Sequence, residues 1–216
     1  MRLKSFSTFA LVAALAGTSA SCGEYVRSQG RSPSQIVIQA LQGAPGNDPD
    51  TFGTPLVSDV ETLVTTPDPC STTSPCLSIF NDLGEVTMAV VLKDQGQPGS
   101  PTEPSLLNSV TFTRYRVVYR RSDGRNTPGV DVPYPIDSAS TFTVAASGDT
   151  SAAFELVRNA AKREAPLLGL RCGSLVLNVI ADVTFYGRDL AGNDVTATGS
   201  IGVNFGDFAP VGGSCN

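Results

Sequence analysis

Apolar and polar residues alternate along much of the chain, and this period of two predicts β-strands. The alternation is clearest in residues 175–187 and 195–205, each of which places its apolar side chains on one face. Strands of this kind bury one face against a core and expose the other. Shorter apolar runs predict six more strands, over residues 35–41, about 62–65, 85–93, 109–121, 140–145 and 151–157.

Loops rich in Gly, Pro, Asp and Asn separate these segments, and the longest cover residues 42–55, 94–104 and 122–137. One short connecting helix is predicted over residues 158–164, which are good helix formers that stop before Pro166. Periodicity alone also permits this helix to begin at Phe154. Several short strands, little helix and many turns predict a single all-β domain, an antiparallel β-sandwich of about seven or eight strands, over residues 35–216.

The segment between the last two strands, residues 189–194 (DLAGND), has the composition of a hairpin turn, because Gly and Asn tolerate a positive φ. With its flanking strands it reads ADVTFYGRDLAGNDVTATGSIGVNF and resembles the closing hairpin of bacterial immunoglobulin-like domains. Residues 109–121 and the SDG turn that follows resemble a central strand of a fibronectin-type sandwich. These resemblances imply an immunoglobulin-like sandwich and no known activity.

The N-terminus is typical of an export signal. Arg2 and Lys4 precede an apolar run over residues 9–16, which is far shorter than the roughly 20 residues a membrane span needs. Ser19-Ala20-Ser21-Cys22 resembles the lipobox of bacterial lipoproteins, although Ser19 replaces the usual leucine. The resemblance implies that residues 1–21 are removed and that Cys22 is acylated. The alternative is cleavage after Ala20, which leaves Cys22 as a thiol.

Residues 22–34 are polar and without periodicity, so we expect a flexible tether that reaches roughly 40 Å when extended. The lipoprotein resemblance implies a bacterial cell-envelope protein anchored to a membrane through lipid. Gly23 stands where an inner-membrane retention signal would have Asp, which favours the outer membrane. The side of the membrane stays open.

Charge and composition exclude several functions. Without the signal the chain has 13 basic and 20 acidic residues, a net charge of −7, so nucleic acid is not an expected partner. The absence of His removes the imidazole base, the Ser-His and Cys-His pairs and histidine metal ligands. We expect no cofactor and assign no catalytic residue and no metal ligand.

Five cysteines are present in this exported chain. If Cys22 carries lipid, the other four can form two disulfides in an oxidising compartment, in any of three connectivities. We predict a local Cys70–Cys76 bond around STTSP. We also predict Cys172–Cys215, because a hairpin centred near residues 191–192 places position 172 opposite about position 211.

The densest positive charge lies on the predicted strand over residues 109–121. Arg114, Arg116 and Arg120 share one of its faces and are candidates for anion binding, since guanidinium groups suit carboxylates and sulfates. The alternative is a solvated strand face whose arginine stems cover neighbouring apolar surface. Three tyrosines could stack on sugar or, as we favour, pack in the core or on the sheet: Tyr115, Tyr119 and Tyr186.

Acidic residues offer weaker candidates. Two groups could supply oxygens to Ca²⁺, although a role in turns is favoured for both: Asp182, Asp189, Asn193 and Asp194, and Asn47, Asp48 and Asp50. Glycoside hydrolysis needs two paired carboxylates, and no spacing in the sequence identifies such a pair. Glu155, Glu164 and Asp182 lie near predicted elements.

The sequence therefore favours a lipid-anchored envelope β-sandwich with a non-catalytic binding or structural role. Its expected partners are the membrane, reached through the lipid, and an envelope protein or anionic glycan. Two alternatives stay open: an envelope hydrolase that uses paired carboxylates, and an assembly or subunit protein that adds a strand to a partner.

Overall fold

The structure is a computed structural model that describes residues 31–208. It is an all-β fold with twelve strands in this range, rather than the predicted seven or eight. Each of the eight predicted strand segments overlaps one of these strands. The helices of the described range are three short 3₁₀ helices, none of them long and apolar enough to cross a membrane.

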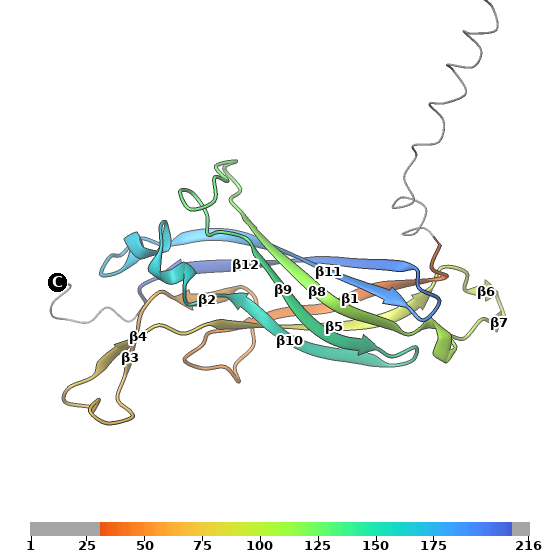
Figure 1. Cartoon of the computed structure of the whole chain (residues 1–216), viewed down its shortest axis with the longest axis horizontal. Helices are drawn as coiled ribbons and strands as arrows, with labels where there is room; N and C mark the ends of the chain where they lie inside the picture. Colours follow the sequence, from red (N-terminus) through yellow and green to blue (C-terminus); the bar gives the residue numbers. More distant parts are fainter. Residues whose placement is uncertain (1–30, 209–216) are drawn as a thin grey trace, which may run out of the picture.

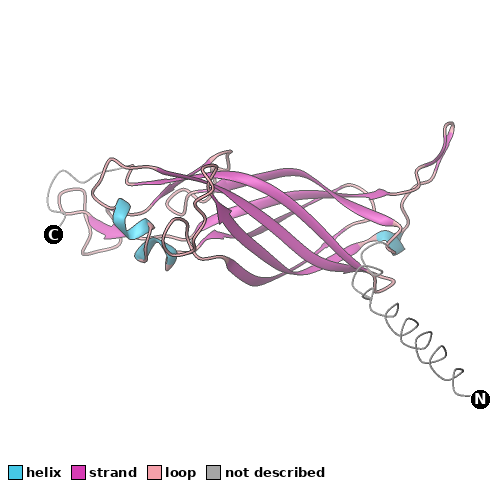
Figure 2. Cartoon of the chain, turned by 90° about the horizontal axis from the view of Figure 1, so that it is seen from above, coloured by secondary structure: helices cyan, strands magenta, loops and turns pink. Residues whose placement is uncertain are grey.

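Eight of the strands form two sheets that run along the length of the molecule (Figure 1). The smaller sheet is antiparallel and has the order β1 (Ser34–Ala44), β5 (Asp82–Leu92), β10 (Asp149–Val157). The larger sheet has the order β2 (Leu56–Asp59), β12 (Asp194–Gly206), β11 (Leu177–Asp189), β8 (Val110–Arg120), β9 (Ile136–Val144). All its pairs are antiparallel except β2 with β12. Figure 2 shows that the sheets are curled.

The other four strands form two small ribbons outside these sheets, at opposite ends of the molecule (Figure 1). One ribbon pairs β3 (Thr62–Val64) with β4 (Cys76–Ser78), and the other pairs β6 (Gly96–Gln97) with β7 (Ser100–Pro101). The predicted strand near residues 62–65 therefore exists but does not join the main sheets. The short β2 takes a place in the larger sheet that the sequence pattern did not indicate.

The β11–β12 hairpin confirms the predicted pairing to within one residue. Leu177 lies opposite Phe205 and Arg188 lies opposite Asp194, so the hairpin is centred on Ala191. Gly192 in the turn has a φ of 84°, a region that glycine adopts without steric cost, and its N–H donates to the Asp189 carbonyl at 3.0 Å.

The two sheets enclose one apolar core. Strand β5 contributes Val86, Met88 and Val90 from alternate positions, as the period of two requires. Aromatic rings from both sheets meet at its centre, where Phe154 of β10 lies 5.2 Å from the Tyr115 ring of β8 and 5.3 Å from the Phe185 ring of β11. Edge-to-face contacts at these distances add to the stabilisation from burial.

Two tyrosine hydroxyl groups also tie the sheets together. The Tyr119 hydroxyl donates to the Leu156 carbonyl at 2.6 Å. The Tyr115 hydroxyl donates to the Glu155 carbonyl at 3.1 Å and accepts from the Glu155 N–H at 3.2 Å. Burial raises the pKa of both phenols. Both rings belong to the core, which resolves the choice between sugar stacking and packing for these two tyrosines.

The predicted helix over residues 158–164 is wrong in type and length. The structure has a 3₁₀ helix, η2 (Ala161–Arg163), followed by η3 (Leu167–Leu170). The seven residues are too few for a stable α-helix. The short turn also directs Lys162 into the interior, where its Nζ lies 2.8 Å from Asp82 Oδ1.

Candidate binding site on the larger sheet

The three arginines predicted to share a strand face do so on β8. Tyr115, Val117 and Tyr119 point into the core from alternate positions, and this leaves Arg114, Arg116 and Arg120 exposed on the outer face of the larger sheet. The strand therefore presents guanidinium groups from a rigid surface.

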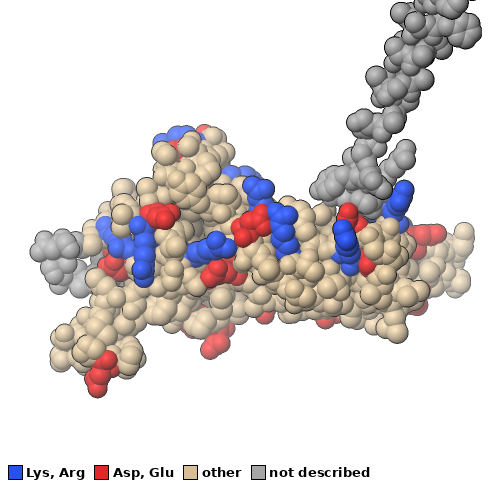
Figure 3. All heavy atoms as spheres, in the orientation of Figure 1, with Lys and Arg blue, Asp and Glu red and all other residues tan. Residues whose placement is uncertain are grey.

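Acidic neighbours neutralise two of these arginines. Arg114 forms a two-pronged ion pair with Asp137 of β9, with 2.6 Å between Nε and Oδ1. Arg120 Nε lies 2.6 Å from Asp182 Oδ2 of β11, and Ser200 donates to the same carboxylate. Arg116 forms none of the ion pairs found within residues 31–208. Figure 3 shows the result as basic and acidic side chains that alternate along this face.

A β-bulge interrupts β8 beside Arg114. The pairing of β8 with β9 shifts between Phe112 and Arg114, and the pairing with β11 shifts at Tyr186 and Gly187. Both Thr113 and Arg114 are consequently exposed on the outer face. Gly187 is required here, because a Cβ at this position would collide with the Thr111 carbonyl and the Phe112 side chain.

An open pocket of about 470 Å³ lies at this bulge. Its lining residues come from β8, β11 and the β11–β12 turn: Thr111, Thr113, Arg114, Tyr186, Gly187, Arg188, Asp189, Leu190 and Asp194. The Arg114 guanidinium lies over the Tyr186 ring, with its Cζ 5.0 Å from the ring centroid. Arg188 Nε pairs with Asp194 Oδ1 at 2.8 Å while 71% of the Arg188 side chain stays exposed. The pocket therefore combines two guanidinium groups, threonine hydroxyls and an aromatic ring.

The carboxylates around the site are held in the ionised form. The hydrogen bond from Arg114 lowers the pKa of Asp137. Burial opposes ionisation at Asp182, but hydrogen bonds from Arg120 and Ser200 outweigh it and leave its pKa below the ordinary value. Burial is likewise outweighed at Asp189, where hydrogen bonds from Asn193 lower the pKa.

The proposed calcium ligands do not gather into a metal centre. Asp182 faces Arg120, whereas Asp189 accepts the Asn193 N–H and side-chain amide, each at 2.8 Å. Across residues 31–208, no three Asp, Glu, Cys or His side chains are close enough to hold a metal ion. Asp189 and Asn193 have the turn role that the sequence favoured.

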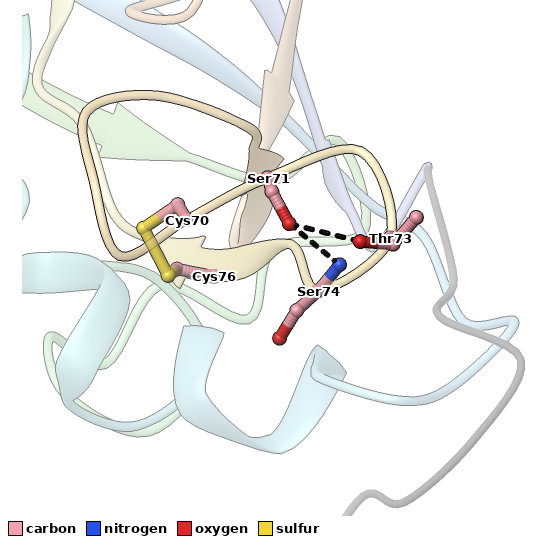
Figure 4. The surroundings of a disulfide bond; sticks show 5 residues. All are labelled: Cys70, Ser71, Thr73, Ser74 and Cys76. Atoms are coloured by element: carbon pink, nitrogen blue, oxygen red, sulfur yellow. Dashed lines mark hydrogen bonds between the residues drawn. A yellow bond between two sulfur atoms is a disulfide. The ribbon is translucent and has the colours of Figure 1, made fainter.

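The Cys70–Cys76 disulfide is present as predicted, with 5.3 Å between the Cα atoms. It closes the loop between β3 and β4, where the Ser71 hydroxyl is 3.2 Å from the Thr73 hydroxyl and accepts the Ser74 N–H at 3.0 Å (Figure 4). Cys172 is also disulfide-bonded. Its predicted partner Cys215 lies outside the described residues, as does Cys22, so that pairing and the acylation stay predictions.

Two features of the structure were not found from the sequence. Arg188 belongs to the pocket, but it is separated in the chain from the β8 arginines, and only the antiparallel pairing of β8 with β11 places it beside Arg114. The buried pair of Asp82 and Lys162 was also missed. Asp82 was the available signal, since it occupies the same inward phase of β5 as Val86, Met88 and Val90.

Comparisons with known proteins do not assign this chain to a family. No protein-family model matches it, and no curated protein matches it. Among solved structures it is similar to one described as the X-ray structure of a Northeast Structural Genomics Consortium target, SoR45. The two share 8% sequence identity and a TM-score of 0.33, over 85% of this chain and 94% of that one. Similarity at this level assigns neither a family nor a function.

Proposed function

We propose that this protein is a lipid-anchored, non-catalytic binding module of the bacterial cell envelope. The anchor is Cys22, preceded by the lipobox-like Ser19-Ala20-Ser21 and an apolar segment too short to span a bilayer. Two or more acyl chains, at about 0.8 kcal/mol for each buried CH₂ group, are enough to hold a protein on a membrane. Gly23 favours the outer membrane.

The domain that follows is proposed to be an immunoglobulin-like sandwich, and the strand order supports this. In that fold the last two strands form a hairpin whose first strand pairs with the third major strand. Here the β11–β12 hairpin pairs with β8, and β9 extends the sheet beyond β8. The opposite sheet joins β1, β5 and β10, which correspond to the first, second and fifth strands of the constant-type arrangement.

The proposal of a binding function rests on the pocket at the β8 bulge. Arg114 and Arg188 are each paired with one carboxylate, so the proposal relies on the guanidinium N–H groups outside these pairs, which can donate to carboxylate or sulfate groups of a ligand. The pocket's threonine hydroxyls and the Tyr186 ring suit the hydroxyl groups and apolar faces of a sugar. We therefore propose an anionic glycan as the ligand, with an anionic segment of an envelope protein as the alternative.

Paired-carboxylate hydrolysis is the less favoured function. A general acid of that kind needs a carboxyl group with a raised pKa. In the pocket, the pKa of Asp189 is lowered and Asp194 is paired with Arg188. These groups are suited to stabilising the site rather than to donating a proton.

Strand addition to a partner is the second candidate, and one observation favours it. Within the described sheets, β9 and β10 each pair along one side only. Strand β10 has nine residues; its backbone at Glu155 and Leu156 already bonds the Tyr115 and Tyr119 hydroxyl groups, and the residues before Glu155 are enough to accept a short strand from another chain. Proline substitution at Ala153, near the middle of this edge strand, should abolish capture of such a partner.

Membrane fractionation of the full chain and its Cys22→Ser variant tests the anchor. We expect the parent protein in the membrane fraction and the variant in the soluble fraction. The Cys70→Ser, Cys76→Ser double variant is the matched control, because it loses cysteines without losing the anchor. Retention of the Cys22→Ser variant with membranes would show that the anchor is wrong.

Equilibrium binding to uronic-acid-containing and sulfated oligosaccharides tests the pocket. We expect Arg188→Ala to weaken binding about tenfold or more, because hydrogen bonds to charged groups contribute about 1.5–3 kcal/mol. Arg163→Ala is the control, since Arg163 is exposed and lies outside the pocket. Equal affinities for the two variants would exclude the pocket as the binding site.

A further inference from the structure

Three highly exposed leucines lie at the end of the molecule where the described chain begins. Leu106 and Leu107, in η1 (Leu106–Asn108), are 83% and 72% exposed, and Leu190 in the β11–β12 turn is 61% exposed. Burying large apolar side chains is favourable, so three of them exposed at one end of a domain mark a contact surface.

Hydrogen bonds fix these leucines close to the start of β1. The Asn108 side-chain amide donates to the Ser34 hydroxyl at 3.0 Å. Ser32 donates to the Asp189 carboxylate, next to Leu190. Figure 2 shows η1 at the end of the molecule where β1 begins. The leucines therefore lie next in sequence to residues that contact Ser32 and Ser34, at the start of β1.

The length of the tether limits where this end can lie. Nine Cα–Cα steps separate Cys22 from Arg31, the first described residue, so this part of the tether spans at most roughly 30 Å. Strand β11 alone has 13 residues, which extend about 43 Å. A lipid on Cys22 therefore keeps the leucine end of the domain near the bilayer, whereas the β3–β4 ribbon lies at the opposite end (Figure 1).

We propose that Leu106 and Leu107, together with Leu190, which also lines the pocket at the β8 bulge, form a membrane-contacting surface that inserts into the headgroup–acyl boundary of the bilayer holding the Cys22 lipid. This inference rests on the proposed anchor. Exposed Arg31, Lys93 and Arg188 at this end are accompanied by exposed Asp94 and Glu103 and by Asp194, which pairs with Arg188, so the surface has no excess of positive charge. The contact therefore depends on the apolar side chains and does not require anionic lipids.

Photocrosslinking of the full, acylated chain in isolated membranes tests this surface. A p-benzoyl-phenylalanine residue replaces Leu106 in one variant and Leu190 in another. The matched control carries it in place of Leu77, which is 52% exposed in β4 at the opposite end. After irradiation, the intact mass of each protein reports covalent phospholipid adducts. We expect phospholipid adducts at positions 106 and 190 and none at position 77.

The outcomes separate the inference from the anchor on which it rests. If the protein fractionates with membranes through Cys22 but gives no lipid adducts at positions 106 and 190, the contact surface is wrong and the anchor stands. Equal yields of phospholipid adducts at positions 77 and 106 would also show that the contact surface is wrong. Covalent adducts between position 106 and another protein would show that this surface contacts a protein partner instead of lipid. If the parent chain is not found in membranes, the anchor and the inference fail together.

Discussion

Lys162 and Asp82 form an ion pair inside the protein, with 2.8 Å between Nζ and Oδ1 and 1% of each side chain exposed. Asp82 also accepts hydrogen bonds from the Ser58 hydroxyl at 2.5 Å and from the Gly46 N–H at 2.9 Å. The pair thus connects β2, β5, the loop after β1 and η2. The two additional hydrogen bonds to Asp82 help to offset the cost of burying its charge.

Replacing Lys162 with Met should therefore lower the free energy of unfolding by about 3–5 kcal/mol, because it leaves the Asp82 charge buried without its partner. Urea denaturation measures the loss. Arg163→Met is the matched control, since Arg163 is the exposed neighbour of Lys162 in η2, and its replacement should change stability by less than about 0.5 kcal/mol. Equal effects of the two substitutions would contradict this role for the pair.

Local pattern was sufficient to predict the seven long strands of the two main sheets, because each buries a face that repeats every second residue. Residues 175–187 and 195–205 correspond to β11 and β12, and the turn composition between them located the hairpin. The Cys70–Cys76 bond was predictable for a similar reason, since both residues lie in one short loop. The inward phase of Tyr115 and Tyr119 follows from the same alternation.

Contacts between distant segments could not be predicted in this way. The parallel pairing of β2 with β12 joins residues near position 57 to residues near position 204, and β2 has only four residues to carry a pattern. Arg188 reaches the pocket only through the register of β8 on β11. Lys162 lies in a segment with helical composition, and its burial depends on Asp82, 80 positions away.

Gly187 allows the close approach of β8 and β11 at the bulge, so Gly187→Ala should destabilise the protein and distort the pocket. A Cβ there meets the backbone of Thr111 and Phe112, which cannot move aside like a flexible side chain. We expect a loss of about 1–3 kcal/mol, as for other overpacking substitutions. Gly169→Ala is the control because nothing lies within 4 Å of its added Cβ. Thermal unfolding of both variants measures the difference, and an unchanged Gly187→Ala protein would contradict this role.

Asp123 lies between two arginines in the loop after β8. Hydrogen bonds from Arg121 and then Arg125 lower its pKa to about 2. Because the folded pKa is below the unfolded value of about 3.9, the stabilisation is complete above pH 4 and is lost as the pH falls through about 2. NMR titration of the carboxyl group should show this pKa, and Arg121→Ala should raise it more than Arg125→Ala does. A titration near 3.9 in the parent protein would contradict the paired geometry.

Cys172 should be recovered with Cys215 in non-reducing peptide maps. Cys172 is disulfide-bonded, and its N–H donates to Asp207 Oδ2 at 2.7 Å, so the first residue after β12 lies beside it. The predicted Cys172–Cys215 bond closes a loop of about 43 residues. The chain-entropy relation predicts that it raises the free energy of unfolding by about 4 kcal/mol, against about 2 kcal/mol for the short Cys70–Cys76 loop.

Cys215→Ser should therefore lower the unfolding free energy more than Cys76→Ser does and leave Cys172 reactive to a thiol reagent. A map that joins Cys172 to Cys22, or a Cys215→Ser protein in which Cys172 stays unreactive, would show that the predicted pairing is wrong.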